Sequence, residues 1–137
     1  MTLITNVASY CGRTAQHYSE MNDLRAAVTA IDPDFEIFAF PCNQFGGQEP
    51  NPIDDIVAFA QSKGSSFVMM EKADVNGPNA HPVFETLKRE MGTGDITWNF
   101  GVYFLIMPDG TVMQHLGSPA EIKGYLMQTA EQRRAEL

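Results

Sequence analysis

The chain has 137 residues, a length that suits one domain built around one core. Its net charge of −8, from 9 Lys and Arg against 17 Asp and Glu, argues against binding to nucleic acid or to an anionic membrane surface. No apolar run approaches the ~20 residues of a membrane span, and two cysteines are too few for a disulfide framework, so a reducing, cytoplasmic setting is expected.

The N-terminal third of the sequence predicts a strand, a helix and a second strand. The apolar run from Leu3 to Ser9 predicts the first strand. An amphipathic helix is expected from Gly12 to Ile31, since its apolar residues recur with a period near 3.6, and Asp32-Pro33 ends it. The short aromatic segment from Phe35 to Phe40 predicts a buried strand.

The remaining sequence alternates loops with short predicted elements. The loop from Pro41 to Pro50 holds two glycines and two prolines, and Asn51 is then expected to cap a helix that ends near Gly64. Further predicted elements are a strand at 67–70, a helix at 82–91, and a hairpin of 103–107 with 111–116. Ser118 and Glu121 form a capping box, which predicts a C-terminal helix.

This order of elements, βαβ followed by an insert and then ββα, predicts an α/β thioredoxin-like fold in which helices flank a central mixed sheet. Chemistry in open α/β sheets collects at the carboxyl ends of the strands. We therefore expect Cys11, the loop from Pro41 to Pro50 and the segment before Tyr103 to meet at one end of the sheet.

Cys11 stands where the first predicted strand gives way to a helix, at the positive end of the helix dipole, which favours thiolate over thiol. Thr14 occupies the position of the second cysteine of a dithiol oxidoreductase, so a single-thiol nucleophile is favoured. A thiolate that attacks a peroxide needs uncharged N–H donors, which the 41–50 loop and Trp98-Asn99-Phe100 contain. Taken alone, Trp98 would be interpreted as a core aromatic and Gln48 as a loop-capping amide.

Four segments, in this order along the chain, resemble the signature motifs of the glutathione peroxidase family. They are Asn6–Gly12, Phe40–Pro50, Val75–Gly77 with Ala80–Pro82, and Trp98–Phe100. The resemblance implies that Cys11 is the peroxidatic nucleophile and that Gln48, Trp98 and Asn99 complete the catalytic set. The implied reaction reduces hydrogen peroxide or an organic hydroperoxide, converts Cys11 to a sulfenic acid, and uses an external thiol to restore it.

The resemblance also implies a single thioredoxin-like domain over residues 1–137, without the N-terminal hairpin that is usual in the family. A monomer is expected, because the segment from Met91 to Trp98 lacks the long insertion associated with tetramers. No metal, flavin or nucleotide cofactor is implied, and the three histidines share no metal-ligand spacing. The cytoplasm is the expected compartment, and an organelle is the alternative if the native N-terminus is longer.

The sequence leaves alternatives open for the reductant and for the function itself. Ala60 stands where thioredoxin-dependent members carry a resolving cysteine, which favours glutathione, although Gln16 replaces an arginine of tetrameric glutathione-specific members. The first alternative is a peroxidase reduced by thioredoxin or another dithiol, with Cys42 taking part. The second is a weakly active redox-sensing or binding module with a thioredoxin-like fold.

Overall fold

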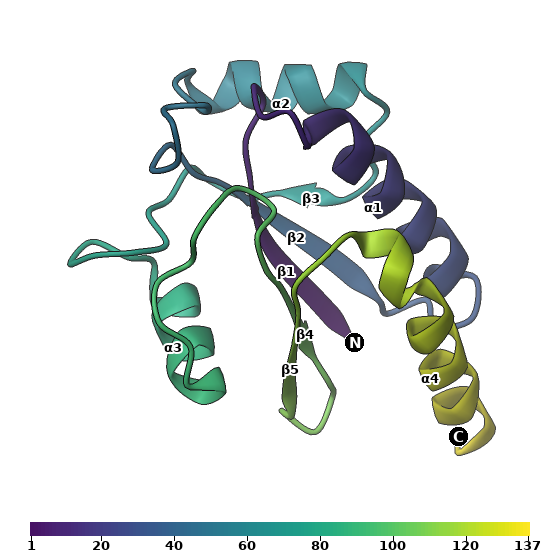
Figure 1. Cartoon of the computed structure of the whole chain (residues 1–137). Coiled ribbons are helices and arrows are strands. Elements are labelled where there is room, and N and C mark those ends of the chain that lie inside the picture. The colour runs from purple at the N-terminus through teal and green to yellow at the C-terminus, as the bar shows by residue number, and fades with distance from the viewer.

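A mixed five-stranded sheet in the order β3-β2-β1-β4-β5 forms the centre of the computed structural model, which describes all 137 residues (Figure 1). The central strand β1 (Thr2–Val7) pairs in parallel with β2 (Glu36–Pro41) and antiparallel with β4 (Tyr103–Ile106). β3 (Val68–Met69) continues the parallel side, and β5 (Val112–His115) closes the antiparallel hairpin with β4. The predicted thioredoxin-like arrangement is therefore present.

The helices cover both faces of this sheet. α1 (Thr14–Thr29) and α4 (Lys123–Ala135) pack against each other on one side, and α3 (Pro82–Met91) lies on the other (Figure 1). α2 (Ile53–Ser62) follows the long loop after β2, and the single 3₁₀ turn η1 (Pro119–Ile122) leads into α4. None of the helices has the length and apolar character required to span a lipid bilayer.

Two apolar cores separate the sheet from its helices. The first core, of 17 buried residues, lies between the sheet and the pair α1 and α4, and the second, of 10, lies beneath α3. Because successive residues of a strand point to opposite faces, Leu3 and Val7 of β1 join the first core and Ile4 joins the second. β1 is therefore buried on both faces, as expected for a central strand.

The sequence predicts the elements better than their ends. The predicted helix at 82–91 is confirmed with the same bounds, but the strand expected to reach Ser9 stops at Val7 and the helix expected from Gly12 begins at Thr14. The intervening residues form a turn, which hydrogen bonds to other loops hold outside regular structure. The C-terminal capping box is present, yet it opens the 3₁₀ turn η1 before α4 begins at Lys123.

The prediction that Asn51 caps α2 is wrong. The helix begins at Ile53, its N-cap residue is Pro52, and no side chain caps it. Asn51 instead uses its Nδ2 to donate to Tyr10 Oη, at 2.8 Å. A tertiary contact with the turn after β1 has therefore replaced the local cap.

Candidate active site

Residues 8–13 form the turn between β1 and α1, and they present Cys11 as a free, partly exposed thiol. The Cys11 carbonyl accepts the Thr14 N–H at 3.1 Å, and the Arg13 N–H donates to Cys11 Sγ at 3.5 Å. The Thr14 hydroxyl donates to the Ala8 carbonyl at 2.6 Å and closes the turn. The thiol is thereby held just before the first turn of α1, with a backbone amide directed at its sulfur.

A side-chain hydrogen bond joins two loops that lie far apart in the sequence. Asn99 Nδ2 donates to Gln48 Oε1 at 3.0 Å, and it also lies 3.4 Å from the Phe45 carbonyl oxygen. The backbone carbonyl of Gln48 accepts the Tyr10 N–H at 3.1 Å, which ties the same loop to the Cys11 turn. Because Oε1 of Gln48 is held by Asn99, the N–H₂ group of Gln48 faces away from Asn99.

Trp98 packs against the same loop. A Cβ placed at Gly46 would lie 3.1 Å from Trp98 Cη2 and 3.4 Å from Gln48 Cδ, so both side chains approach the Gly46 backbone closely. Gly46 also has a φ of +68°, a conformation that other residues rarely adopt. The rings of Phe45 and Trp98 are 6.1 Å apart between centroids. Glycine at this position therefore allows the indole and the Gln48 amide to lie side by side.

Asn6 in β1 fixes the segment that carries Trp98 and Asn99. Its Nδ2 donates to the Trp98 carbonyl at 3.2 Å, and its own carbonyl accepts the Phe100 N–H at 2.9 Å. Phe100 has a φ of 55°, in the left-handed region, so the backbone bends sharply there. The middle strand thus determines where Trp98 and Asn99 lie relative to the Cys11 turn.

An open cleft of about 430 Å³ adjoins Trp98. Arg13 and His17, at the start of α1, line the opposite side. His17 Nδ1 lies 2.7 Å from Tyr103 Oη, and burial lowers the pKa of His17 below its ordinary value. Arg13 is therefore the cation of a cleft whose remaining walls are uncharged.

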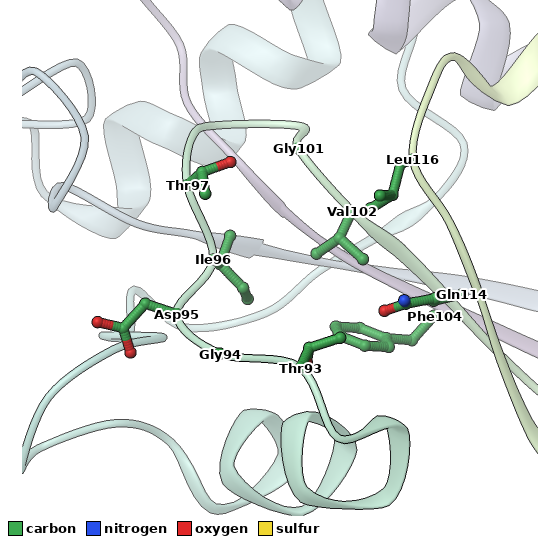
Figure 2. Close-up of a pocket in the computed structure, with 10 residues that line it drawn as sticks. All are labelled: Thr93, Gly94, Asp95, Ile96, Thr97, Gly101, Val102, Phe104, Gln114 and Leu116. Atoms are coloured by element: carbon green, nitrogen blue, oxygen red, sulfur yellow. The ribbon is translucent and has the colours of Figure 1, made fainter.

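A second cavity, of about 180 Å³, adjoins this cleft, and Figure 2 shows the residues that line it. Ile96, Val102 and Phe104 give it an apolar lining, and Figure 2 shows their side chains turned toward one another. The two cavities share three lining residues, Thr97, Gly101 and Leu116. The polar cleft beside Trp98 thus shares part of its wall with an apolar cavity.

Cys42 has different surroundings from Cys11. It is fully buried in the second core, its thiol donates to Gln44 Oε1 at 3.4 Å, and burial raises the pKa of this thiol. Ala60 is also buried, in the first core, so the position expected for a resolving cysteine presents only a methyl group.

The comparisons with known proteins agree with these observations. A sequence model described as "Glutathione peroxidase" matches residues 1–88. "Glutathione peroxidase 1, mitochondrial" of Chlamydomonas reinhardtii is 44% identical over 97% of this chain and 68% of its own length. The chain belongs to the glutathione peroxidase family. It is accordingly a thiol-dependent peroxidase by family, a class of oxidoreductase.

A further relative and two solved structures are also similar to this chain. "Glutathione peroxidase 1" of Helianthus annuus is 46% identical over 77% of this chain, and the chain spans 64% of that protein. The crystal structure of "T. cruzi GPX1" has a TM-score of 0.70 and 33% identity, over 94% of this chain and 80% of that one. A thioredoxin family protein from Chlorobium tepidum, at 16% identity and TM-score 0.60, shares the fold alone over 95% of this chain and 79% of that one.

The structure brings the predicted loops together at one end of the sheet, as the sequence predicts. Two buried polar residues at the same place, Asn6 and Glu49, were not expected to have functional roles. Each had a signal in the sequence, since Asn6 interrupts an apolar strand and Glu49 directly follows Gln48. Their burial depends on long-range contacts, which a single sequence does not display.

Proposed function

We propose that this chain reduces hydrogen peroxide and organic hydroperoxides through Cys11 and that glutathione is the electron donor. The supporting observation is the Asn99–Gln48 hydrogen bond, which orients the Gln48 amide beside Trp98, in a loop that also bonds to the Cys11 turn. Such an arrangement provides uncharged donors for the negative charge that develops on sulfur and on the departing oxygen.

In the proposed reaction, the Cys11 thiolate attacks the outer oxygen of the hydroperoxide. An S–O bond forms as the O–O bond breaks, and the leaving oxygen takes the proton given up by the thiol, so the products are a sulfenic acid and an alcohol or water. One glutathione then displaces water to form a mixed disulfide, and a second releases glutathione disulfide and restores the thiol. Sulfur is oxidised by two electrons in the first step and reduced by two in the others.

The geometry favours different roles for the three amide and indole groups. We assign Gln48 and Trp98 the stabilising role, in which their amide and indole N–H groups donate to the sulfur and to the leaving oxygen. Both hydrogens of Asn99 Nδ2 are directed at acceptors, Gln48 Oε1 and the Phe45 carbonyl, and the side chain is fully buried. We therefore assign Asn99 the role of positioning Gln48.

Organic hydroperoxides are included because of the apolar cavity that adjoins the cleft at Trp98. An apolar group on the hydroperoxide would displace water from Ile96 and Val102, and burial of apolar surface is favourable. Arg13, on the cleft wall, offers an anionic thiol such as glutathione a partner for one of its carboxylates.

Glutathione is proposed over a dithiol protein because neither candidate resolving position fits. Ala60 has no thiol, and Cys42 is buried with a raised pKa, which keeps it in the poorly nucleophilic thiol form. A thioredoxin-type reductant is the alternative, and a weakly active redox-sensing or binding module is the second.

Steady-state turnover separates these functions. The assay compares glutathione with glutathione reductase against thioredoxin with thioredoxin reductase, each with hydrogen peroxide and with cumene hydroperoxide. We expect turnover with glutathione and none in Cys11→Ser. Turnover with thioredoxin but not with glutathione would show that thioredoxin is the reductant. A wild type that is inactive with every thiol would contradict a peroxidase function and favour the redox-sensing or binding module.

The compartment, the oligomeric state and the independence from cofactors belong to the same proposal. A cytoplasmic location is supported by two free cysteines, which suit a reducing compartment. Relatives named mitochondrial and chloroplastic make an organelle the competing outcome of a cell-fractionation experiment. A monomer would elute at the mass of one chain, 15.2 kDa, and activity without metal, flavin or nucleotide would survive dialysis against a chelator.

A further inference from the structure

Glu49 is the most deeply buried acidic residue near the proposed active site. Its side chain is 0% exposed, neither carboxylate oxygen has a hydrogen-bond donor, and no cation forms an ion pair with it. The backbone N–H of the same residue donates to Asn43 Oδ1 at 2.9 Å, so the loop fixes where the side chain enters the interior. A charged carboxylate without a partner is strongly disfavoured in such surroundings.

Two further buried hydroxyl groups in the surroundings of this carboxyl group also lack partners. They are Ser9 Oγ, two residues before Cys11 in the turn, and Tyr18 Oη, which projects from α1. We call these three side chains the buried oxygen cluster. It lies where the Cys11 turn, α1 and the Gln48 loop come together.

The groups around Glu49 do not compensate a negative charge. Burial raises the pKa of Glu49, and it outweighs the opposing effects of the Ser9 hydroxyl and amide, which fall short of hydrogen-bond geometry, and of the Lys72 ammonium. Burial and the nearby Glu49 both raise the pKa of Tyr18, and Glu49 has a smaller effect in the same direction on Cys42. An ionised Glu49 would thus be a buried charge that no hydrogen bond or ion pair compensates.

We propose that Glu49 is an uncharged carboxylic acid at neutral pH and that it positions the Cys11 turn against the Gln48 loop. Only the protonated acid has an O–H donor. With that proton, each of the three side chains of the buried oxygen cluster has both a donor and an acceptor, so hydrogen bonding among them does not require a buried charge. Loss of the proton leaves a buried charge next to Ser9, two residues before Cys11.

The proposal has a consequence for stability with a definite sign. An acid whose pKa is higher in the folded state binds more protons when folded, so stability falls as pH rises above the unfolded value of about 4.3. The fall continues until pH passes the folded pKa and then levels off. For catalysis, which rests on the proposed function, the same ionisation displaces the Cys11 turn and lowers turnover on the alkaline side.

Three variants test this role. Glu49→Gln keeps the shape and an N–H donor but cannot ionise, Glu49→Ala removes the contact, and Glu71→Gln neutralises an exposed carboxylate as a matched control. Three quantities are measured from pH 5 to 9: the urea unfolding midpoint, the rate of Cys11 alkylation by iodoacetamide followed by peptide mass spectrometry, and kcat/KM for hydrogen peroxide.

We expect Glu49→Gln to remove the decline in unfolding midpoint with rising pH and to keep kcat/KM at pH 7 within about twofold of wild type. Glu49→Ala should lower kcat/KM by at least about tenfold, because a small displacement of reacting groups has a large kinetic cost. Glu71→Gln should resemble wild type in every measurement.

Equal losses of activity in Glu49→Gln and Glu49→Ala would overturn the proposal, because they would show that the ionised carboxylate is required. The same pH dependence of the unfolding midpoint in Glu49→Gln and in wild type would overturn it as well. If the wild type reduces no hydroperoxide, the proposed function fails, whereas the unfolding and alkylation experiments still decide the state of Glu49.

Discussion

Cys11 and Cys42 follow neighbouring parallel strands at the same end of the sheet, and the Cys42 N–H donates to the carbonyl of Val7, the last residue of β1, at 3.0 Å. Cys11 lies in a turn that is partly open to solvent and accepts a backbone N–H at its sulfur. Cys42 is fully buried and donates its S–H to Gln44. The fold therefore presents one thiol as an acceptor and encloses the other as a donor.

This difference arises from the segment that comes after each strand. After β1 the chain turns within six residues into α1, so the sulfur of Cys11 accepts the N–H of Arg13, the N-cap residue of the helix. After β2 the chain enters a long loop, and the Gln44 side chain in it also accepts the N–H groups of Val75 and Asn76, which covers Cys42. Position at a strand end is therefore not enough to make a cysteine reactive, because the next segment decides its exposure and hydrogen-bonding role.

The largest expected contrast between the two thiols is in peroxidase activity. Cys11→Ser should lower kcat/KM for hydrogen peroxide by at least about 10³-fold, because the nucleophile is lost. Cys42→Ala should stay within about threefold of wild type, since only packing changes. Steady-state kinetics with glutathione measures both. A comparable loss in the two variants would make Cys42 a participant and favour the dithiol alternative.

Substitution of the two proposed N–H donors, Trp98 and Gln48, should have the next largest effect on activity. Trp98→Phe keeps an aromatic ring against Gly46 and removes the indole N–H, and Gln48→Ala removes the amide. Each should lower kcat by about 10²-fold, the usual cost of one stabilising donor. Neither variant should change the alkylation rate of Cys42, which is the internal control.

A double-mutant cycle tests how Gln48 and Asn99 act together. If Asn99 works by orienting Gln48 through their 3.0 Å hydrogen bond, then Asn99→Ala in a Gln48→Ala background should cost little more than Gln48→Ala alone. Fully additive losses would show that Asn99 contributes independently to catalysis.

A smaller effect is expected at the apolar cavity that adjoins the cleft beside Trp98. Leu116 lines both cavities and is 70% exposed, so Leu116→Ser should leave the fold intact. Loss of part of a leucine contact costs about 1 kcal/mol, which is roughly a fivefold lower kcat/KM for cumene hydroperoxide. Hydrogen peroxide kinetics should not change. Leu137→Ser, at an exposed leucine that does not line either cavity, serves as the control.

The sequence predicts the residues of the candidate site but not all of its geometry. Cys11, Gln48, Trp98 and Asn99 lie in short contiguous motifs, and the strand order that brings these motifs together follows from the pattern of elements. The hydrogen bonds that join these segments link residues 38 to 94 positions apart, such as Asn6 with the Phe100 N–H. No local pattern specifies such pairings.

Local rules are least reliable where a tertiary contact competes with them. Asn51 has the sequence context of a helix cap, yet its side chain bonds to Tyr10 and Pro52 occupies the cap position. Glu49 is likewise a charged loop residue, a type that is usually exposed, and yet it is fully buried. Both exceptions lie against the turn that carries Cys11, where selection for a fixed geometry can override local preference.

The smallest expected effect is on stability, where substitution of Cys42 should matter more than substitution of Cys11. Cys42 packs within the second core, so Cys42→Ala leaves a small cavity and should lower the free energy of unfolding by about 1 kcal/mol. Cys11 is partly exposed, and Cys11→Ala should change the free energy of unfolding by less than about 0.5 kcal/mol. Urea denaturation at pH 7 under reducing conditions measures both. If Cys11→Ala were the more destabilising change, the Cys11 turn would owe its structure to the sulfur contact with the Arg13 N–H, and the division between a reactive and a structural cysteine would fail.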